Sequence, residues 1–128
     1  MTGIDHLLDT NIVIGLLKGA ESTVALAQQA GLVLSRAAVS QITRMELLGF
    51  ADLTEAEERA TRSFLSACQV VGITDEIEAE AIRLRRSGAL KLPDAIVAAT
   101  ALSTGAVLLT LDRRLARVVN AQRGTDAG

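Results

Sequence analysis

The chain has 128 residues, of which 49% are hydrophobic and 2% aromatic, and its formal net charge is −2. This length and hydrophobic content correspond to one domain with its own core and exclude a wholly disordered chain. Binding of nucleic acid by surface charge or by stacking on aromatic rings would require a basic or aromatic-rich chain, so a polynucleotide substrate would need a bound cation and a local basic patch.

Apolar runs and helical spacings alternate along the chain, separated by turn residues. In chain order, the sequence predicts a strand over residues 4–9, helices over 11–18 and 21–30, a strand over 32–39, helices over 41–49 and 55–66, a strand over 69–73, helices over 75–86 and 93–103, a strand over 106–111, a short basic helix after Asp112 and an edge strand at 118–119. This alternation predicts an α/β fold with a parallel sheet flanked by helices on both faces. We expect one domain over residues 1–122 and a frayed tail over 123–128.

Capping residues support the helix boundaries. Ser40 and Thr74 are favourable N-caps, and Thr54 with Glu57 has the spacing of a capping box. Pro93 suits the first turn of its helix.

One apolar stretch, residues 92–111, is about long enough to cross a bilayer. Pro93 and the turn at residues 103–105 divide it, so we interpret it as a buried helix, a turn and a buried strand. The N-terminus has no basic region of the kind found in signal peptides. We therefore expect a cytoplasmic protein without a membrane segment.

Two acids directly follow predicted strands. Asp9 ends the first strand and Asp112 the last clear one. In parallel sheets flanked by helices, ligands bind at the carboxyl ends of strands, near the point where the strand order reverses. Each Asp also has a structural interpretation as a helix N-cap.

Two further acids lie in apolar surroundings. Glu46 falls on a helical stripe with Ile42, Met45 and Gly49, where an unpaired carboxylate is costly, although pairing with Arg36 at the edge of the stripe is an alternative. Asp94 is the sole charge in the apolar stretch, and an Asp in a first helical turn also complements the helix dipole.

Four carboxylates gathered at one end of a sheet would raise one another's pKa unless a cation were present. Mg²⁺ and Mn²⁺ favour oxygen ligands, and sites of this kind support attack of water on a phosphodiester. Hydrogen bonds from Thr10, Asn11 and Thr110 could orient the carboxylates or the water.

Four segments resemble the acidic motifs of PIN-domain proteins, in the expected order: Leu7-Leu8-Asp9-Thr10-Asn11, Thr43-Arg44-Met45-Glu46-Leu47, Leu92-Pro93-Asp94-Ala95-Ile96 and Leu109-Thr110-Leu111-Asp112. The similarity is greatest to VapC-like toxins of prokaryotic toxin–antitoxin pairs. It implies a Mg²⁺- or Mn²⁺-dependent endoribonuclease with Asp9, Glu46, Asp94 and Asp112 at the metal positions. It also implies an RNA substrate, a homodimer and a cognate antitoxin that inhibits the enzyme.

RNA would require positive charge near these acids. Arg44 lies close to Glu46 in sequence, and a basic run follows Asp112: Arg113, Arg114 and Arg117. These side chains could contact phosphates, or they could form an ordinary solvated helix face.

Two other functions remain open. An aspartyl-phosphate phosphohydrolase would use an Asp at the end of the first strand as a nucleophile, but Asn11 occupies the position of its second Asp. A catalytically silent PIN-like binding module would keep the fold and partner contacts, but would not require all four acids. A single His and a single Cys make a zinc site of these ligands implausible.

Overall fold

The computed structural model describes residues 3–127, with side chains described as far as residue 124. In chain order its elements are β1 (His6–Leu8), α1 (Thr10–Lys18), α2 (Glu21–Ala30), the 3₁₀ helix η1 (Leu34–Arg36), β2 (Ala37–Ser40), α3 (Gln41–Leu48), α4 (Glu55–Ala67), β3 (Gln69–Val71), α5 (Asp75–Arg86), α6 (Leu92–Thr104), β4 (Val107–Leu109) and α7 (Arg113–Ala127). The predicted α/β fold class is confirmed.

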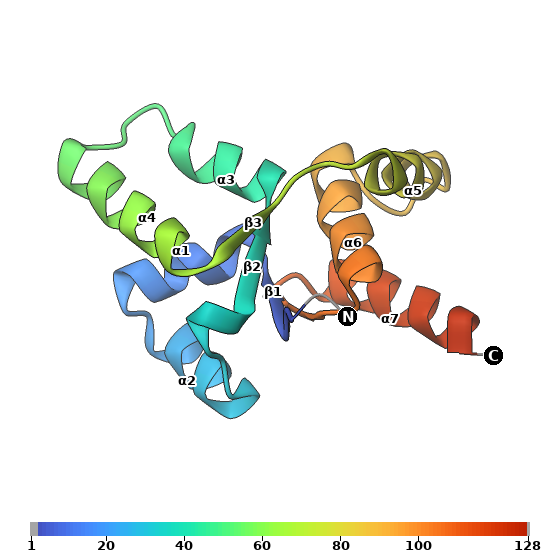
Figure 1. Ribbon diagram of the computed structural model, residues 1–128, viewed down its shortest axis with the longest axis horizontal. Helices are drawn as coiled ribbons and strands as arrows, with labels where there is room; N and C mark the ends of the chain where they lie inside the picture. Colours follow the sequence, from blue (N-terminus) through green and yellow to red (C-terminus); the bar gives the residue numbers. More distant parts are fainter. Residues whose placement is uncertain (1–2, 128) are drawn as a thin grey trace.

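The strands form a parallel sheet in the order β3-β2-β1-β4. Helices α1–α4 cover one face and α5–α7 cover the other, with the sheet between them (Figure 1). The chain leaves β1 toward β2 and β3 and later returns to the opposite side of β1 as β4. The strand order therefore reverses at β1, and the carboxyl ends of β1 and β4 lie next to each other.

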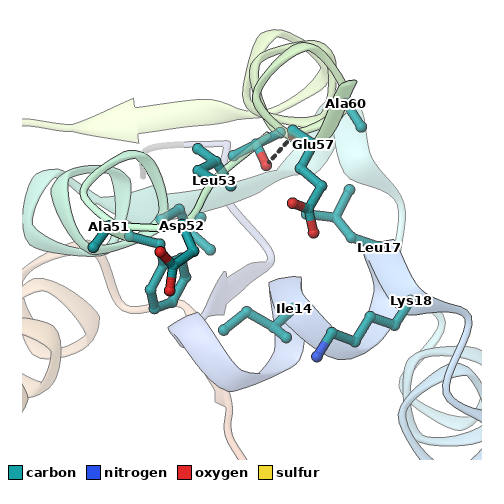
Figure 2. Close-up of a pocket in the computed structure, with 11 residues that line it drawn as sticks. Ile14, Leu17, Lys18, Ala51, Asp52, Leu53, Glu57 and Ala60 are labelled. Atoms are coloured by element: carbon teal, nitrogen blue, oxygen red, sulfur yellow. Dashed lines mark hydrogen bonds between the residues drawn. The ribbon is translucent and has the colours of Figure 1, made fainter. Parts of the chain in front are cut away.

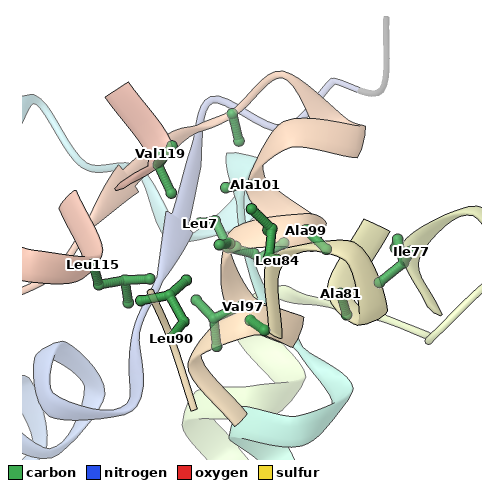
Figure 3. Close-up of a cluster of buried hydrophobic side chains, with 14 residues drawn as sticks. Leu7, Ile77, Ala81, Leu84, Leu90, Val97, Ala99, Ala101, Leu115 and Val119 are labelled. Atoms are coloured by element: carbon green, nitrogen blue, oxygen red, sulfur yellow. The ribbon is translucent and has the colours of Figure 1, made fainter. Parts of the chain in front are cut away.

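Neighbouring residues of β1 belong to opposite cores, because successive side chains of a strand point to opposite faces. Leu7 is fully buried among residues of α5, α6 and α7, including Leu84, Val97 and Leu115 (Figure 3). Leu8 is also fully buried, in the cluster formed with α1, α3 and α4. The central strand thus anchors both helical layers.

Helix α6 is buried on several sides, and small residues allow its close packing. The buried residues are Ala95, Val97, Ala98, Ala99, Thr100 and Ala101. This explains the long apolar stretch in the sequence without a membrane. Within residues 3–127, every helix is too short or too polar to span a bilayer.

The predicted helix caps are present. Ser40 Oγ accepts a hydrogen bond from the Ile42 N–H, and Thr74 Oγ1 accepts one from the Ile77 N–H. Both reciprocal bonds of the Thr54–Glu57 capping box are formed. These contacts satisfy N–H groups that have no partner inside their helices.

Two predicted strand segments were wrong. Residues 32–36 lie outside β2, because the Leu32 N–H binds the carbonyl of Ala27 and the Arg36 N–H binds that of Val33, so this backbone turns on itself. Residues 118–119 belong to α7, not to an edge strand. Val119 is 1% exposed and lies one helical turn after the buried Leu115, which places both on the face that packs against α6.

The end of α7 is attached to the preceding helix. The Arg123 guanidinium donates hydrogen bonds to the carbonyl oxygens of Ala101 and Ala106, which flank the end of α6. A cation at a helix C-terminus complements the helix dipole. The sequence predicts a frayed tail over residues 123–128; residues 123–127 lie in α7, and Gly128 lies outside the described residues.

Helices α1 and α2 approach closely at Gly15. A Cβ added there would lie 2.7 Å from Cβ of Thr23, which is 2% exposed. A β-branched side chain has few alternative rotamers, so Thr23 cannot easily move away.

We expect Gly15→Ala to lower the free energy of unfolding by about 1–3 kcal/mol, despite the better helix propensity of alanine. Gly124→Ala in α7 is the matched control, because an added Cβ meets nothing within 4 Å there. It should stabilise the protein by about 0.5 kcal/mol. Urea denaturation measures both changes, and equal effects of the two substitutions would contradict the close contact at Gly15.

Candidate functional site

Asp9 occupies the carboxyl end of β1 and is 6% exposed. Its Oδ1 accepts a hydrogen bond from the Thr10 N–H at 2.8 Å. Its Oδ2 accepts from the Thr110 hydroxyl at 2.7 Å and from the Asn11 side-chain amide at 3.3 Å. These three bonds hold the buried carboxylate in one orientation, as burial of a charged group requires.

The same residues tie the end of β1 and the start of α1 to the loop after β4. Asn11 Oδ1 accepts a hydrogen bond from the Leu111 N–H at 3.2 Å, and Thr110 Oγ1 accepts one from the Asp112 N–H at 3.0 Å. Leu8 and Leu109 are direct partners in the sheet, so the chain brings Asp9 and Thr110 together immediately beyond the last pair.

Glu46 is exposed on α3, so its predicted position on the apolar face was wrong. The buried face of α3 contains Thr43 and Leu47, while Met45 is 58% exposed. The reason is rotational: Thr43 and Leu47 are four residues apart and face the core together, which turns Met45 and Glu46 toward solvent. Glu46 Oε1 accepts a hydrogen bond from the Thr10 hydroxyl at 2.7 Å.

Arg36 does not pair with Glu46, which the sequence left open. Its guanidinium instead forms a bidentate ion pair with Asp5. The side-chain contact of Glu46 with Thr10 links α3 to the residue directly after Asp9.

Asp94 is half-buried in the first turn of α6, and its carboxylate accepts no hydrogen bond from the part of the chain whose side chains are described, residues 3–124. Burial raises the pKa of Asp94, and the negative charges of Asp9, Asp112 and Glu46 raise it further. The positive charge of Lys91 opposes this rise in pKa. Asp9, Glu46 and Asp112 are therefore each near enough to Asp94 to act on it through their charges.

Asp112 acts as the N-cap of α7. Its Oδ1 accepts hydrogen bonds from the Arg114 N–H at 3.0 Å and the Leu115 N–H at 3.1 Å. Asp112 is thus a helix N-cap, as one interpretation of the sequence predicts. Its charge nevertheless acts on Asp94.

The donor set suits a hard divalent cation, because all four side chains offer carboxylate oxygens. Among the side chains of residues 3–124, however, no three from acidic residues, His or Cys are grouped tightly enough to ligate one metal ion together. Charge effects on Asp94 and the lack of a tight group of ligands among these side chains agree, because Coulomb effects reach farther than metal–ligand bonds. The four residues therefore suit a divalent cation in their oxygen ligands and their negative charge.

The candidate RNA contacts are placed on two helices. Arg113, Arg114 and Arg117 are exposed at the start of α7, and Arg44 is half-buried on α3. Lys91, which sequence patterns did not single out, is an exposed residue at the N-cap position of α6. The sequence could have indicated Lys91 by its position three residues before Asp94, because this spacing places both charges at the same end of α6.

The remaining nucleophilic side chains do not join this group. His6 begins β1 at the end opposite to Asp9, and its buried Nδ1 has no hydrogen-bond partner among the described residues, whereas a catalytic triad requires an orienting acid there. Burial raises the pKa of the Cys68 thiol, which disfavours the reactive thiolate.

A separate apolar pocket of about 430 Å³ lies between α1, the loop after α3 and α4. Figure 2 shows Ile14 and Leu17 of α1 facing Ala51, Leu53 and Ala60 across it. None of the four acids lines this pocket. It is a hydrophobic recess distinct from the acidic group.

Comparison with known proteins identifies the domain. The family model of the PIN domain matches residues 6–121. The comparison with curated proteins found no match.

Solved structures share the fold over nearly the whole chain. A toxin–antitoxin complex from Klebsiella pneumoniae contains a chain with 34% identity and a TM-score of 0.73, and the match covers 84% of this chain and 87% of that one. FitAcB from Neisseria gonorrhoeae matches with 26% identity and a TM-score of 0.73 over 90% and 93% of the two chains. VapBC-1 from nontypeable Haemophilus influenzae matches with 28% identity and a TM-score of 0.69 over 96% and 94%.

The raised pKa of Asp94 predicts a pH-dependent effect on stability. The folded protein binds the Asp94 proton more tightly than the unfolded chain, so ionisation destabilises the fold as pH rises above the ordinary value of 3.8. In EDTA, Asp94→Asn should therefore raise the melting temperature at pH 7 by a few degrees. The gain should disappear below the ordinary pKa, where the carboxyl is protonated in both states.

Asp75→Asn is the control for this experiment, because Asp75 also lies in a first helical turn but is exposed. It should give no gain in melting temperature at pH 7. A loss of stability in Asp94→Asn at pH 7 would show that repulsion among the acids does not govern this site.

Proposed function

Because the chain belongs to the PIN domain family, we propose that it is a Mg²⁺- or Mn²⁺-dependent endoribonuclease with Asp9, Glu46, Asp94 and Asp112 as its metal-binding and catalytic residues. Nuclease activity and the use of divalent metal ions are general in this family. The observation that carries the proposal is geometric: Thr10 binds both Asp9 and Glu46, and Thr110 binds both Asp9 and the backbone of Asp112. The charges of these three acids also raise the pKa of Asp94.

Each part of the site would have a distinct task. A bound divalent ion supplies activation of a water molecule and offsets negative charge on the scissile phosphate. Asp9, held by Thr10, Asn11 and Thr110, is the most firmly oriented of the acids. Glu46 is exposed and would be oriented by its bond to the Thr10 hydroxyl. These hydrogen bonds prearrange the ligands, which reduces the cost of ordering them in the reaction.

The proposed biological role is that of a toxin in the cytoplasm, with RNA as its substrate. The similar chains from Klebsiella pneumoniae and Haemophilus influenzae belong to a toxin–antitoxin complex and to VapBC-1. A cognate antitoxin is therefore the proposed protein partner, and a homodimer the proposed assembly. The apolar pocket beside α1 supports a partner, because two large hydrophobic residues that line it, Leu17 and Phe50, are 38% and 49% exposed.

Cleavage of RNA by the purified chain tests the activity. With Mg²⁺ or Mn²⁺ we expect discrete fragments from total RNA, no fragments in EDTA, and a loss of at least about 100-fold in rate for Asp9→Asn and for Asp94→Asn, because each removes a charged metal ligand. Asp5→Asn is the matched control. Asp5 precedes β1 at the opposite end of the strand from Asp9 and pairs with Arg36 at the surface, so its loss should leave the rate unchanged.

Two results would contradict the proposal. Cleavage that persists in Asp9→Asn/Asp94→Asn would come from a contaminant or another site. A wild-type chain that shows neither cleavage nor divalent-ion binding in calorimetry would favour a catalytically silent binding module.

The basic residues of α7 predict a salt effect on RNA binding. We expect Arg113→Ala/Arg114→Ala to weaken binding in EDTA, where cleavage stops, and to flatten the slope of log affinity against log salt by about 0.7 for each phosphate that the variant no longer neutralises. Arg85→Ala/Arg86→Ala on α5 is the control with the same change in charge. Equally weakened binding in both double variants would assign the effect to net charge and not to arginines beside the acidic site.

A further inference from the structure

We propose that Thr43 is a positioning residue for Glu46 and that it acts through the Thr10 hydroxyl. The inference rests on the proposed function, because it concerns one of the proposed metal-binding acids. Thr43 lies on α3 one turn before Glu46, so the two side chains are neighbours on the helix. Thr43 is fully buried, however, whereas Glu46 is exposed.

The hydrogen bonds define a direction from the interior to the carboxylate. Thr10 Oγ1 lies 2.7 Å from Glu46 Oε1 and 3.3 Å from Thr43 Oγ1. An ionised carboxylate can only accept, so the single hydroxyl proton of Thr10 goes to Glu46. The contact between the two hydroxyls then requires Thr43 to donate its own proton to Thr10. This order, Thr43 to Thr10 to Glu46, polarises the Thr10 hydroxyl and strengthens its bond to the carboxylate.

Two other buried threonines, Thr61 and Thr100, differ from Thr43 in their hydrogen bonds. The hydroxyls of Thr61 and Thr100 donate to the carbonyl oxygens four residues earlier, as helical threonines commonly do. The hydrogen bond of Thr43 in the described chain instead reaches a hydroxyl 33 residues away, at the start of α1. A valine would fill the same buried volume without a polar group to satisfy, so the hydroxyl is explained by its contact with Thr10.

The hydrogen bonds through Thr10 also limit the conformational freedom of the Glu46 side chain. An exposed glutamate has several rotamers, and each bound ligand side chain loses that freedom. Thr10 is itself fixed, because its backbone N–H binds Asp9. With Thr43 holding the hydroxyl of Thr10, the orientation of Glu46 is set relative to Asp9 before any ligand binds.

Thr43→Val tests this proposal by removing the hydroxyl while keeping the shape. Two readouts are needed: the χ1 rotamer populations of Glu46 from three-bond NMR couplings in the metal-free protein, and the Mn²⁺ dissociation constant from calorimetry. We expect one dominant Glu46 rotamer in the wild type, averaged rotamers in Thr43→Val, and a Mn²⁺ dissociation constant raised about tenfold, as for loss of other groups that orient metal ligands.

Two further variants separate positioning from stability. Thr43→Ser keeps the hydroxyl and should retain the rotamer and the Mn²⁺ affinity. Thr61→Val, the same change at a position that is 4% exposed, should leave both unchanged. If Thr43→Val does not fold, Thr43→Ala replaces it in the same measurements.

The outcomes distinguish this proposal from the proposed function. An unchanged Glu46 rotamer and unchanged Mn²⁺ affinity in Thr43→Val, or averaged Glu46 rotamers already in the wild type, would overturn the role of Thr43. A wild-type protein that binds no Mn²⁺ would refute the metal centre. In that case the rotamer comparison still decides whether Thr43 positions Glu46.

Discussion

The parallel pairing of β1 with both β2 and β4 is the constraint on which the rest of the structure depends. Parallel strands must be joined by crossovers, so every strand ends at the same edge of the sheet and helices fill both faces. The strand order reverses at β1. The chain therefore continues from β1 into α1 on one face of the sheet and from β4 into α7 on the other. Asp9 and Asp112, more than 100 positions apart in sequence, are connected across this point through Thr110.

The hydrogen bonds around Asp9 allow a carboxylate to remain buried beside other acids. Thr110 and Asn11 each bind Asp9 and also a backbone N–H of the loop after β4, so the same side chains satisfy the acid and shape the loop. A network of this kind is stable only when its members are satisfied. The polar residues between the acids are therefore as much a part of the site as the acids.

Asp94, unlike Asp9, is a partly buried carboxylate that is not stabilised by hydrogen bonds within the described part of the chain. Its carboxylate accepts no hydrogen bond among the described side chains and backbone groups, and burial and three negative charges raise its pKa. Its position is set by α6, whose alanines pack closely against the sheet and neighbouring helices. The well-packed helix thus holds a carboxylate where repulsion disfavours it, which is the arrangement expected of a site that binds a cation.

The sequence by itself determined the alternation of strands and helices, the caps at Ser40, Thr54 and Thr74, and the order of the four acids, because these features depend on local spacing and on residues close in the chain. Tertiary structure alone decided that β4 lies beside β1, that Glu46 faces solvent, and that residues 118–119 are helical. The position of Thr43 against Thr10 was equally beyond the sequence. Each of these depends on which face of an element packs against a partner far along the chain, and local periodicity carries no information about that partner.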